Sequence, residues 1–213
     1  MSLSEVLESC YADFARIGGQ RGFLPILVSA FSRPAFGTIF FARLSRYTAE
    51  GSRLSRPLHL TLRALHHIYG RRAGIVLPWQ NHIGPGLRIV GGRGLTINEG
   101  VVLGSNVTLY GGVTLGRQNR RKSAASKSVF PVFPDIGDNV RIGPNAVVLG
   151  ATVGDNSLIC PLSLVDSDIP ARSVTFPVPR APERPVRRPA PVPRAEPEQD
   201  VYPLRKLRAS AGE

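Results

Sequence analysis

Apolar residues in the first part of the chain recur at the three- and four-residue spacing of α-helices. Ser2 and Glu5 have the spacing of a capping box. The apolar residues that follow fall on one helix face: Val6, Leu7, Cys10, Tyr11, Phe14 and Ile17. The stretch FLPILVSAF predicts a second helix.

Two further helices are predicted before residue 78. Pro34 is placed to begin the third, which ends near Gly51 and carries apolar residues at Phe36, Ile39, Phe40, Leu44 and Tyr47. The fourth begins around Ser55 and Pro57, and its apolar face is expected to hold Leu58, Leu62, Leu65 and Ile68. Residues 1–77 are therefore predicted to form a helical region.

Between residues 78 and 176 the apolar pattern changes to a period of six. Aliphatic residues stand at Ile83, Ile89, Leu95, Val101, Val107 and Val113. The period resumes at Ile136, Ile142 and Val148 and, after one five-residue unit, at Val153, Ile159 and Val165. This repeat predicts a mainly β chain built on a hexapeptide-repeat parallel β-helix. With three units to a turn, residues eighteen apart are expected to stack, Ile83 over Val101 and Ile89 over Val107.

Small and turn-forming residues fill the slots between the aliphatic positions, in units such as VLGSNV, IGDNVR and IGPNAV. Gly, Asn and Asp are expected at the corners of the coil, because these residues tolerate tight or left-handed backbone conformations. Adjacent coils are expected to pair as parallel strands.

Residues 119–135 interrupt the repeat and are predicted to leave the β-helix as a protruding loop. Its first part is basic without acidic residues and is suited to phosphate groups, the alternative being a mobile solvated loop. The basic residues are Arg117, Arg120, Arg121, Lys122 and Lys127. Residues 177–213 alternate proline with arginine and small residues and are predicted to be a disordered tail.

The formal net charge is +12, and its distribution limits the function classes. Residues 1–77 hold ten Lys/Arg and four Asp/Glu, residues 78–176 nine and six, and residues 177–213 eight and five. No stacking aromatic residues are interleaved with these charges, so nucleic-acid binding is not expected. The third and fourth predicted helices carry arginines that favour an anionic membrane surface or, alternatively, a solvated face beside an oligomer contact: Arg43, Arg46, Arg53, Arg56, Arg63, Arg71 and Arg72.

The two cysteines, Cys10 and Cys160, lie far apart in sequence, which argues against a disulfide framework and favours the cytoplasm. The first residues lack the basic and apolar segments of a signal peptide, and no apolar stretch is long enough to span a bilayer. We therefore expect a cytoplasmic protein, with contact to the inner membrane face through the basic helices as an open alternative.

Several motifs resemble bacterial serine acetyltransferases and the serine-acetyltransferase-like enzymes of exopolysaccharide clusters over residues 30–180. These are IGPGLRI, GVVLGSNVTLYGGVTLGR, IGDNVRIGPNAVVLGATVGDNSLI and the closing IPARSVTFPVPR. The resemblance implies a left-handed β-helix, a homotrimer, acetyl-CoA as co-substrate without a tightly bound cofactor, and a CoA site between subunits beside the loop. With the charge of the loop, it points to CoA contacts at Gly116, Arg117, Arg120, Arg121, Lys122, Gly143, Asn145 and Arg180.

The histidines of that family are replaced in this sequence. The histidine that acts as general base falls at Gly91, its acidic neighbour at Val90, and a second histidine at Phe133, just before Pro134. The family's closing AGVPAR becomes TFPVPR, with Pro177 in place of a glycine. The remaining candidates for a base are His82, Glu99 and Tyr110. His59, His66 and His67 are expected on the surface of the fourth helix or in an oligomer contact.

Two functions remain open. One is an O-acetyltransferase that acts on serine or on a sugar or polysaccharide hydroxyl, and the other is a catalytically silent homologue that serves as a scaffold or regulatory subunit. No metal site is expected, because the repeat region lacks the three histidines of β-helical zinc enzymes. The glycine pairs Gly91–Gly92 and Gly111–Gly112 either leave space for a larger acceptor or permit close approach of the backbone.

Overall fold

The computed structural model describes residues 2–19, 22–49, 56–121 and 129–177. Lys122, Arg180 and the predicted tail beyond Pro177 lie outside these ranges. The side chains of Arg120 and Arg121 are also not described. The domain boundaries at residues 77 and 176 remain predictions.

The four predicted helices are present. They are α1 (Leu3–Arg16), α2 (Phe23–Ser32), α3 (Pro34–Ala49) and α4 (Arg56–Ala73). The predicted capping box begins α1: Ser2 Oγ accepts a hydrogen bond from the Glu5 backbone N–H, and the Glu5 side chain accepts one from the Ser2 N–H. No single described helix is long and apolar enough to cross a membrane. The pair α2 and α3 passes that test together, but it bends by 115° at the junction.

The predicted apolar face of α4 is partly wrong. Leu62 is buried and Leu65 is half-buried, but Leu58 and Ile68 are exposed. Tyr69 is buried instead, in a cluster of aromatic rings with Phe31 and Phe41. The face that α4 turns inward is therefore rotated relative to the prediction.

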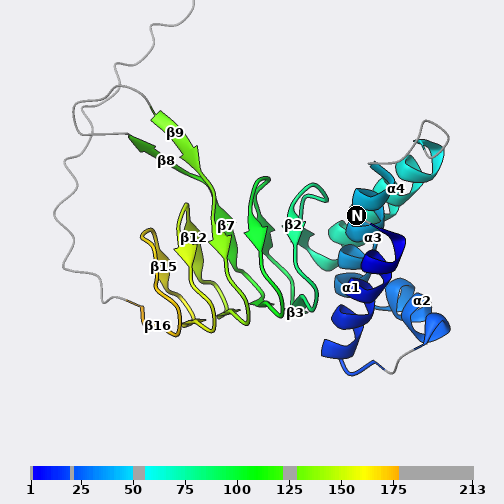
Figure 1. The fold of residues 1–213 in the computed structure, drawn as a ribbon, viewed down its shortest axis with the longest axis horizontal. Coiled ribbons are helices and arrows are strands. Elements are labelled where there is room, and N and C mark those ends of the chain that lie inside the picture. The colour runs from blue at the N-terminus through cyan, green and yellow to red at the C-terminus, as the bar shows by residue number, and fades with distance from the viewer. Residues whose placement is uncertain (1, 20–21, 50–55, 122–128, 178–213) are drawn as a thin grey trace, which may run out of the picture. The chain divides into compact units, whose positions relative to one another are not determined.

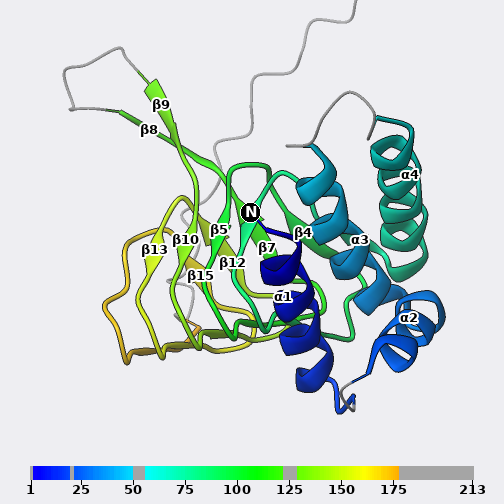
Figure 2. The ribbon, with the colours of Figure 1, turned by 45° about the vertical axis from the view of Figure 1, so that its right-hand side comes forward.

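The repeat region forms a parallel β-helix with three sheets (Figures 1 and 2). Sheet A contains β1 (Ile75–Val76), β4 (Leu95–Ile97), β7 (Thr114–Gly116), β12 (Val147–Leu149) and β15 (Leu164–Val165). Sheet B contains β2 (His82–Ile83), β5 (Val102–Leu103), β10 (Asp135–Ile136) and β13 (Thr152–Val153). Sheet C contains β3 (Arg88–Val90), β6 (Thr108–Tyr110), β11 (Arg141–Ile142), β14 (Leu158–Ile159) and β16 (Val174–Thr175).

The predicted stacking of the first coil is wrong by two residues. Ile83 pairs with Leu103 and Ile89 with Leu109, twenty positions further along instead of eighteen. The corner from Val90 to Gly94 carries the two additional residues. Ile97, which stacks on Leu115, lies eight positions after Ile89, whereas Leu103 lies six positions after Ile97. The six-residue period continues through this insertion because each unit buries two apolar residues, two positions apart. The period passes from the second buried residue of one unit, Ile89, to the first buried residue of the next, Leu95.

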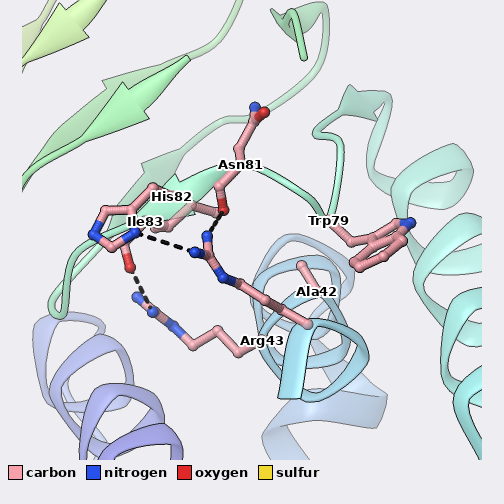
Figure 3. A pocket seen from close by; sticks show the side chains of 7 residues that line it. Ala42, Arg43, Trp79, Asn81, His82 and Ile83 are labelled. Carbon is pink, nitrogen blue, oxygen red and sulfur yellow. Dashed lines mark hydrogen bonds between the residues drawn. The ribbon is translucent and has the colours of Figure 1, made fainter. Parts of the chain in front are cut away.

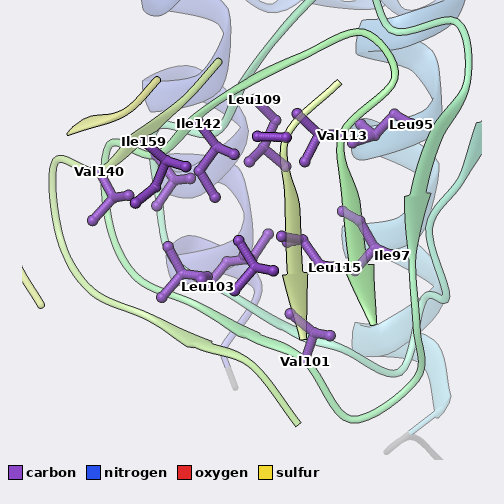
Figure 4. Close-up of a cluster of buried hydrophobic side chains, with 14 of the residues drawn as sticks. Leu95, Ile97, Val101, Leu103, Leu109, Val113, Leu115, Val140, Ile142 and Ile159 are labelled. Atoms are coloured by element: carbon purple, nitrogen blue, oxygen red, sulfur yellow. The ribbon is translucent and has the colours of Figure 1, made fainter. Parts of the chain in front are cut away.

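Two aliphatic residues from most units fill the interior (Figure 4). Val101 and Leu103 are both fully buried, as are Val113 and Leu115 in the next coil. One ladder of the core runs through Ile97, Leu115, Val148 and Val165 on sheet A. Burial of these side chains without polar atoms stabilises the column through the hydrophobic effect.

The corners have the backbone conformations that the sequence predicts. Asn106, Asn139, Asn145 and Asn156 adopt φ between 56° and 58°. Asparagine tolerates this left-handed region better than β-branched residues. Within the predicted protruding loop, β8 (Gln118–Arg121) and β9 (Val129–Val132) pair in antiparallel fashion.

Candidate functional site

A corner between sheets C and A holds the glycine pairs, and we call residues 91–94, 110–112 and 143–146 the glycine corner. Val90 pairs with Tyr110 on adjacent strands, so the half-buried Tyr110 lies beside Gly91. The backbone N–H of Asn145 donates to the carbonyl oxygen of Gly111 at 3.1 Å. Tyr110, Gly143 and Asn145 are therefore brought to one edge of the β-helix.

Three of the four glycines in the pairs are required by close packing. A Cβ on Gly92 would lie 2.6 Å from the side chain of Ile75, one on Gly111 2.3 Å from the carbonyl oxygen of Gly91, and one on Gly112 2.0 Å from the amide of Asn145. Gly91 differs, since a Cβ there would meet nothing within 4 Å, although its φ is +61°. Of the four paired glycines, only Gly91, which is predicted to replace the family's histidine base, therefore has open space beside it.

A second corner, between sheets A and B, forms a pocket at the base of the hairpin. Asn98, Glu99, Gly100, Arg117 and Phe133 line this pocket, which we call the loop pocket. Glu99 and Arg117 are exposed, whereas Phe133 is half-buried with its ring against Gly100. A carboxylate and a guanidinium thus share the pocket with Phe133, which is predicted to replace the family's second histidine. Gly116, also a predicted CoA contact, is buried directly before Arg117.

Asn81 holds the turn that presents Glu99. Its side-chain amide donates to the carbonyl oxygen of Asn98 at 2.9 Å, and its side-chain oxygen accepts from the N–H of Gly100 at 3.0 Å. Asn81 is 3% exposed, so these bonds satisfy a buried amide. Sequence reasoning missed this residue, because it lies just ahead of the first aliphatic position of the repeat.

His82 lies in a different setting, on sheet B beside α3 (Figure 3). Its Nδ1 is 3.3 Å from Nη2 of Arg46, whose Nη1 donates to the carbonyl oxygen of Asn81 at 2.6 Å. The His82 side chain is exposed and pairs in register with Val102. The three candidate bases do not converge in one chain: Glu99 lies in the loop pocket, Tyr110 at the glycine corner and His82 on sheet B.

The histidines of α4 take structural positions, and only His67 is exposed as predicted. His59 packs edge-on against Trp79 and lies 3.0 Å from Thr48 Oγ1. The two ring nitrogens of His66 lie 3.0 Å and 2.8 Å from the carbonyl oxygens of Thr38 and Leu77. Burial lowers the pKa of His66, while hydrogen bonds to these two carbonyls oppose the change. Among the described residues, no three His, Cys, Asp or Glu side chains gather as a metal site would require.

Known serine acetyltransferases are similar to this chain in sequence, although no family model matches it. The enzyme of Helicobacter pylori strain 26695 is 36% identical over 119 residues, which cover 55% of this chain and 66% of that protein. The enzyme of Staphylococcus aureus strain N315 is 34% identical over 122 residues, which cover 57% of this chain and 54% of that protein. The chain thus spans slightly less than two thirds of the first relative and about half of the second.

Solved serine acetyltransferases share the fold. The Neisseria gonorrhoeae enzyme in complex with serine superposes with a TM-score of 0.62 at 25% identity, over 86% of this chain and 71% of that one. The soybean apoenzyme gives 0.61 at 25% identity, over 82% and 68%. The repeat therefore forms the left-handed β-helix of these enzymes. By sequence and fold together, the chain is similar to the serine acetyltransferases.

Proposed function

We propose that the protein transfers an acetyl group from acetyl-CoA to a hydroxyl group, with L-serine as the first candidate acceptor and a sugar or polysaccharide hydroxyl as the second. The acceptor oxygen attacks the thioester carbonyl carbon, the carbon–sulfur bond breaks, and CoA leaves as the thiol. The hydroxyl proton passes to a base on the protein, and the departing sulfur takes up a proton.

The loop pocket is the observation that carries this proposal. It combines the Glu99 carboxylate with the Arg117 guanidinium at the base of the hairpin, next to Phe133. A carboxylate can accept the proton of the hydroxyl, and a guanidinium can bind a phosphate of CoA. The similarity to serine acetyltransferases in sequence and fold adds support for acetyl transfer.

We assign the role of base to the Glu99 carboxylate. The hydroxyl group of Tyr110 is assigned a contact with the acceptor. Glu99 is exposed in a pocket and is held on a turn that Asn81 fixes. His82 is a weaker candidate, because its Nδ1 is already hydrogen-bonded to the guanidinium of Arg46 and its ring lies on sheet B, away from both corners.

The assignment of Glu99 and Tyr110 to the same acceptor favours a homotrimer. The glycine corner and the loop pocket lie at different corners of one chain, so they can face the same substrate only if they come from two copies. Two exposed leucines lie on the next coil, at the corresponding corner and at the start of the strand that follows it. Leu162 is 70% exposed and Leu164 is 62% exposed. Apolar side chains of this kind are typical of a surface that a second copy covers. Gly143 and Asn145, at the same corner, would then contact CoA.

Thiol release from acetyl-CoA, measured with L-serine and with a panel of sugars, tests the transfer. The wild-type protein should release thiol only when an acceptor is present. Glu99→Gln should lower kcat by about 10²-fold or more, because general-base catalysis contributes that much. Glu8→Gln, on the exposed face of α1, is the matched control and should retain the wild-type rate. Equal rates for Glu99→Gln and wild type would refute the role of Glu99.

Arg117 and the trimer need separate measurements. Arg117→Gln should weaken acetyl-CoA binding in calorimetry by about tenfold, as expected for the loss of one charge-assisted hydrogen bond. Leu164→Asp should shift the mass measured by light scattering from three copies to one. A wild-type protein that is monomeric at working concentration would contradict the trimer.

A catalytically silent homologue is the second candidate, favoured by Gly91 and Phe133 at the two histidine positions. Gly91 has open space for a side chain, and histidine tolerates positive φ better than most residues. The two candidates differ in one result, because the silent homologue would bind acetyl-CoA without releasing thiol with any acceptor.

We further propose a cytoplasmic location with contact to the anionic inner face of a membrane through α2 and α4. Two of the seven arginines named for this contact do not support it, since Arg43 is buried and Arg46 donates a hydrogen bond to the Asn81 carbonyl oxygen. Arg53 lies outside the described residues. Exposed arginines on α4 and apolar residues on α2 do support it: Arg56, Arg63, Arg71, Arg72, Phe23, Leu24 and Val28. Flotation should show binding to vesicles with anionic lipid that Leu24→Asp abolishes, and equal binding by both proteins would refute the contact.

A further inference from the structure

Two arginines flank a threonine on the outer face of sheet C. Arg88 on β3, Thr108 on β6 and Arg141 on β11 are partners in register on three adjacent strands. Adjacent strands lie about 4.8 Å apart, so the Cα atoms of the two arginines are separated by about 10 Å. Both arginines are exposed, whereas Thr108 is 5% exposed. The long side chains therefore rise on either side of a small polar one.

A third arginine reaches the same point from the helical region. Nη2 of Arg16, the last residue of α1, donates to Oγ1 of Thr108 at 2.7 Å. Burial lowers the pKa of Arg16, and the positive charges of Arg88 and Arg141 lower it further. The Arg16 guanidinium, bonded to the Thr108 hydroxyl group, thus lies close enough to Arg88 and Arg141 to be affected by both of their charges.

No counter-charge accompanies these three groups among the described residues. Arg43 shows the contrast, because its guanidinium is paired with Asp13 at 2.6 Å. The sequence offers few acids nearby, since residues 14–98 contain twelve arginines, no lysine and one acidic residue, Glu50. Gathering like charges costs free energy, which an anion bound between them would recover.

We propose that Arg16, Arg88, Arg141 and Thr108 form a binding site for an oxyanion with at least two negative charges, such as phosphate or a phosphate or sulfate ester. Guanidinium groups bind such anions through paired, charge-assisted hydrogen bonds. The Thr108 oxygen already accepts from Arg16, so its hydroxyl proton is available to donate to the anion.

Exposed apolar residues beside the arginines favour an anion that carries an organic group. The row that contains Arg141 continues across sheet C with Leu158 and Val174, which are 41% and 52% exposed. An organic group esterified to the anion would lie on this apolar surface. The site is separate from the glycine corner and the loop pocket, and it does not depend on the acetyl-transfer proposal.

Calorimetry of the full-length protein with inorganic phosphate, at constant ionic strength, tests the site. We expect saturable binding that is at least tenfold weaker in Arg88→Gln and in Arg141→Gln, and partly retained in Arg88→Lys. Sulfate should compete with phosphate, whereas chloride should not. Arg172→Gln, on an exposed corner ahead of β16, is a matched control for the loss of one positive charge and should bind as wild type does.

Three results would overturn the proposal. They are the absence of saturable binding, equal affinities in wild type and both Gln variants, and loss of binding in Arg117→Gln but not in Arg88→Gln, which would place the phosphate in the loop pocket. Circular dichroism of each variant identifies misfolding. Loss of acetyl transfer in Arg117→Gln with intact phosphate binding would leave this site standing, so the two proposals fail separately.

Discussion

Arg43 and Asp13 form a buried bidentate ion pair that ties two helices to the first coil of the β-helix. Arg43 Nε and Nη2 donate to the two carboxylate oxygens of Asp13 at 2.6 Å and 3.0 Å. Arg43 also donates to the carbonyl oxygens of Ile83 and Gly84, and Asp13 accepts from the N–H of Leu87. The pair thus joins α1 and α3 to β2 and to the corner that follows it.

Removing one partner of this pair should destabilise the fold strongly. Arg43→Met leaves the Asp13 carboxylate buried without its counter-charge, since both side chains are at most 4% exposed. We expect a loss of about 3–5 kcal/mol in the free energy of unfolding, measured with urea. Arg56→Met, at the exposed start of α4, should change it by less than about 0.5 kcal/mol. Similar effects from the two substitutions would contradict the role of the pair.

The glycine corner predicts a difference between two neighbouring glycines. Gly111→Ala would drive a methyl group against the carbonyl oxygen of Gly91, so adjacent coils must separate. Gly91→Ala meets open space and costs only its left-handed backbone, about 1–2 kcal/mol. The melting temperature of Gly111→Ala should therefore be well below that of Gly91→Ala. The reverse order would show that the coils are spaced differently.

Stability should depend on pH through His66. Because burial lowers its folded-state pKa below 6.5, the unfolded state binds more protons as the pH falls below that value. The free energy of unfolding should therefore decrease on acidification through this range. Urea unfolding at several pH values should show a smaller decrease in His66→Gln than in wild type. An unchanged slope would mean that His66 does not titrate as the structure implies.

The two cysteines should differ in reactivity. Burial raises the pKa of the Cys10 thiol to about 12, with Asp13 adding to the rise and Arg43 opposing it, and its side chain is 1% exposed. Cys160 is half-buried, and both cysteines are free. Because the thiolate is the reactive form, iodoacetamide should label Cys160 in the native protein and Cys10 only after unfolding. Mass spectrometry of digests would reveal native labelling of Cys10, which would contradict this burial.

The helices and the β-helix could be predicted because each follows from a local period in the sequence. The stacking register could not, since Val90–Gly94 adds two residues while the apolar period continues through them. The apolar face of α4 was mispredicted because Tyr69, an amphipathic residue, takes the buried place instead of Ile68. Local patterns determine which elements form, whereas their packing depends on residues far away in the chain.

The candidate site was predictable only in part. Glu99 and Arg117 share a pocket because they lie eighteen residues apart on adjacent coils, a contact that the repeat predicts. Phe133 joins them only because the hairpin returns the chain to the same corner, which spacing alone does not reveal. Asn81 and Arg46 were missed because their partners are backbone carbonyls and amides, which leave no pattern in the sequence. Tyr110 lies at the corner that holds Gly91, but only the register of β3 and β6 places it there.

Detection of an acetylated product tests the central claim most directly. The purified protein would be incubated with acetyl-CoA and L-serine, or with the sugar panel, and the mixture resolved by mass spectrometry. We expect an acceptor 42 Da heavier, formed at least about 10²-fold faster by wild type than by Glu99→Gln. Binding of acetyl-CoA without any acetylated acceptor would contradict acetyl transfer and identify the protein as a catalytically silent homologue.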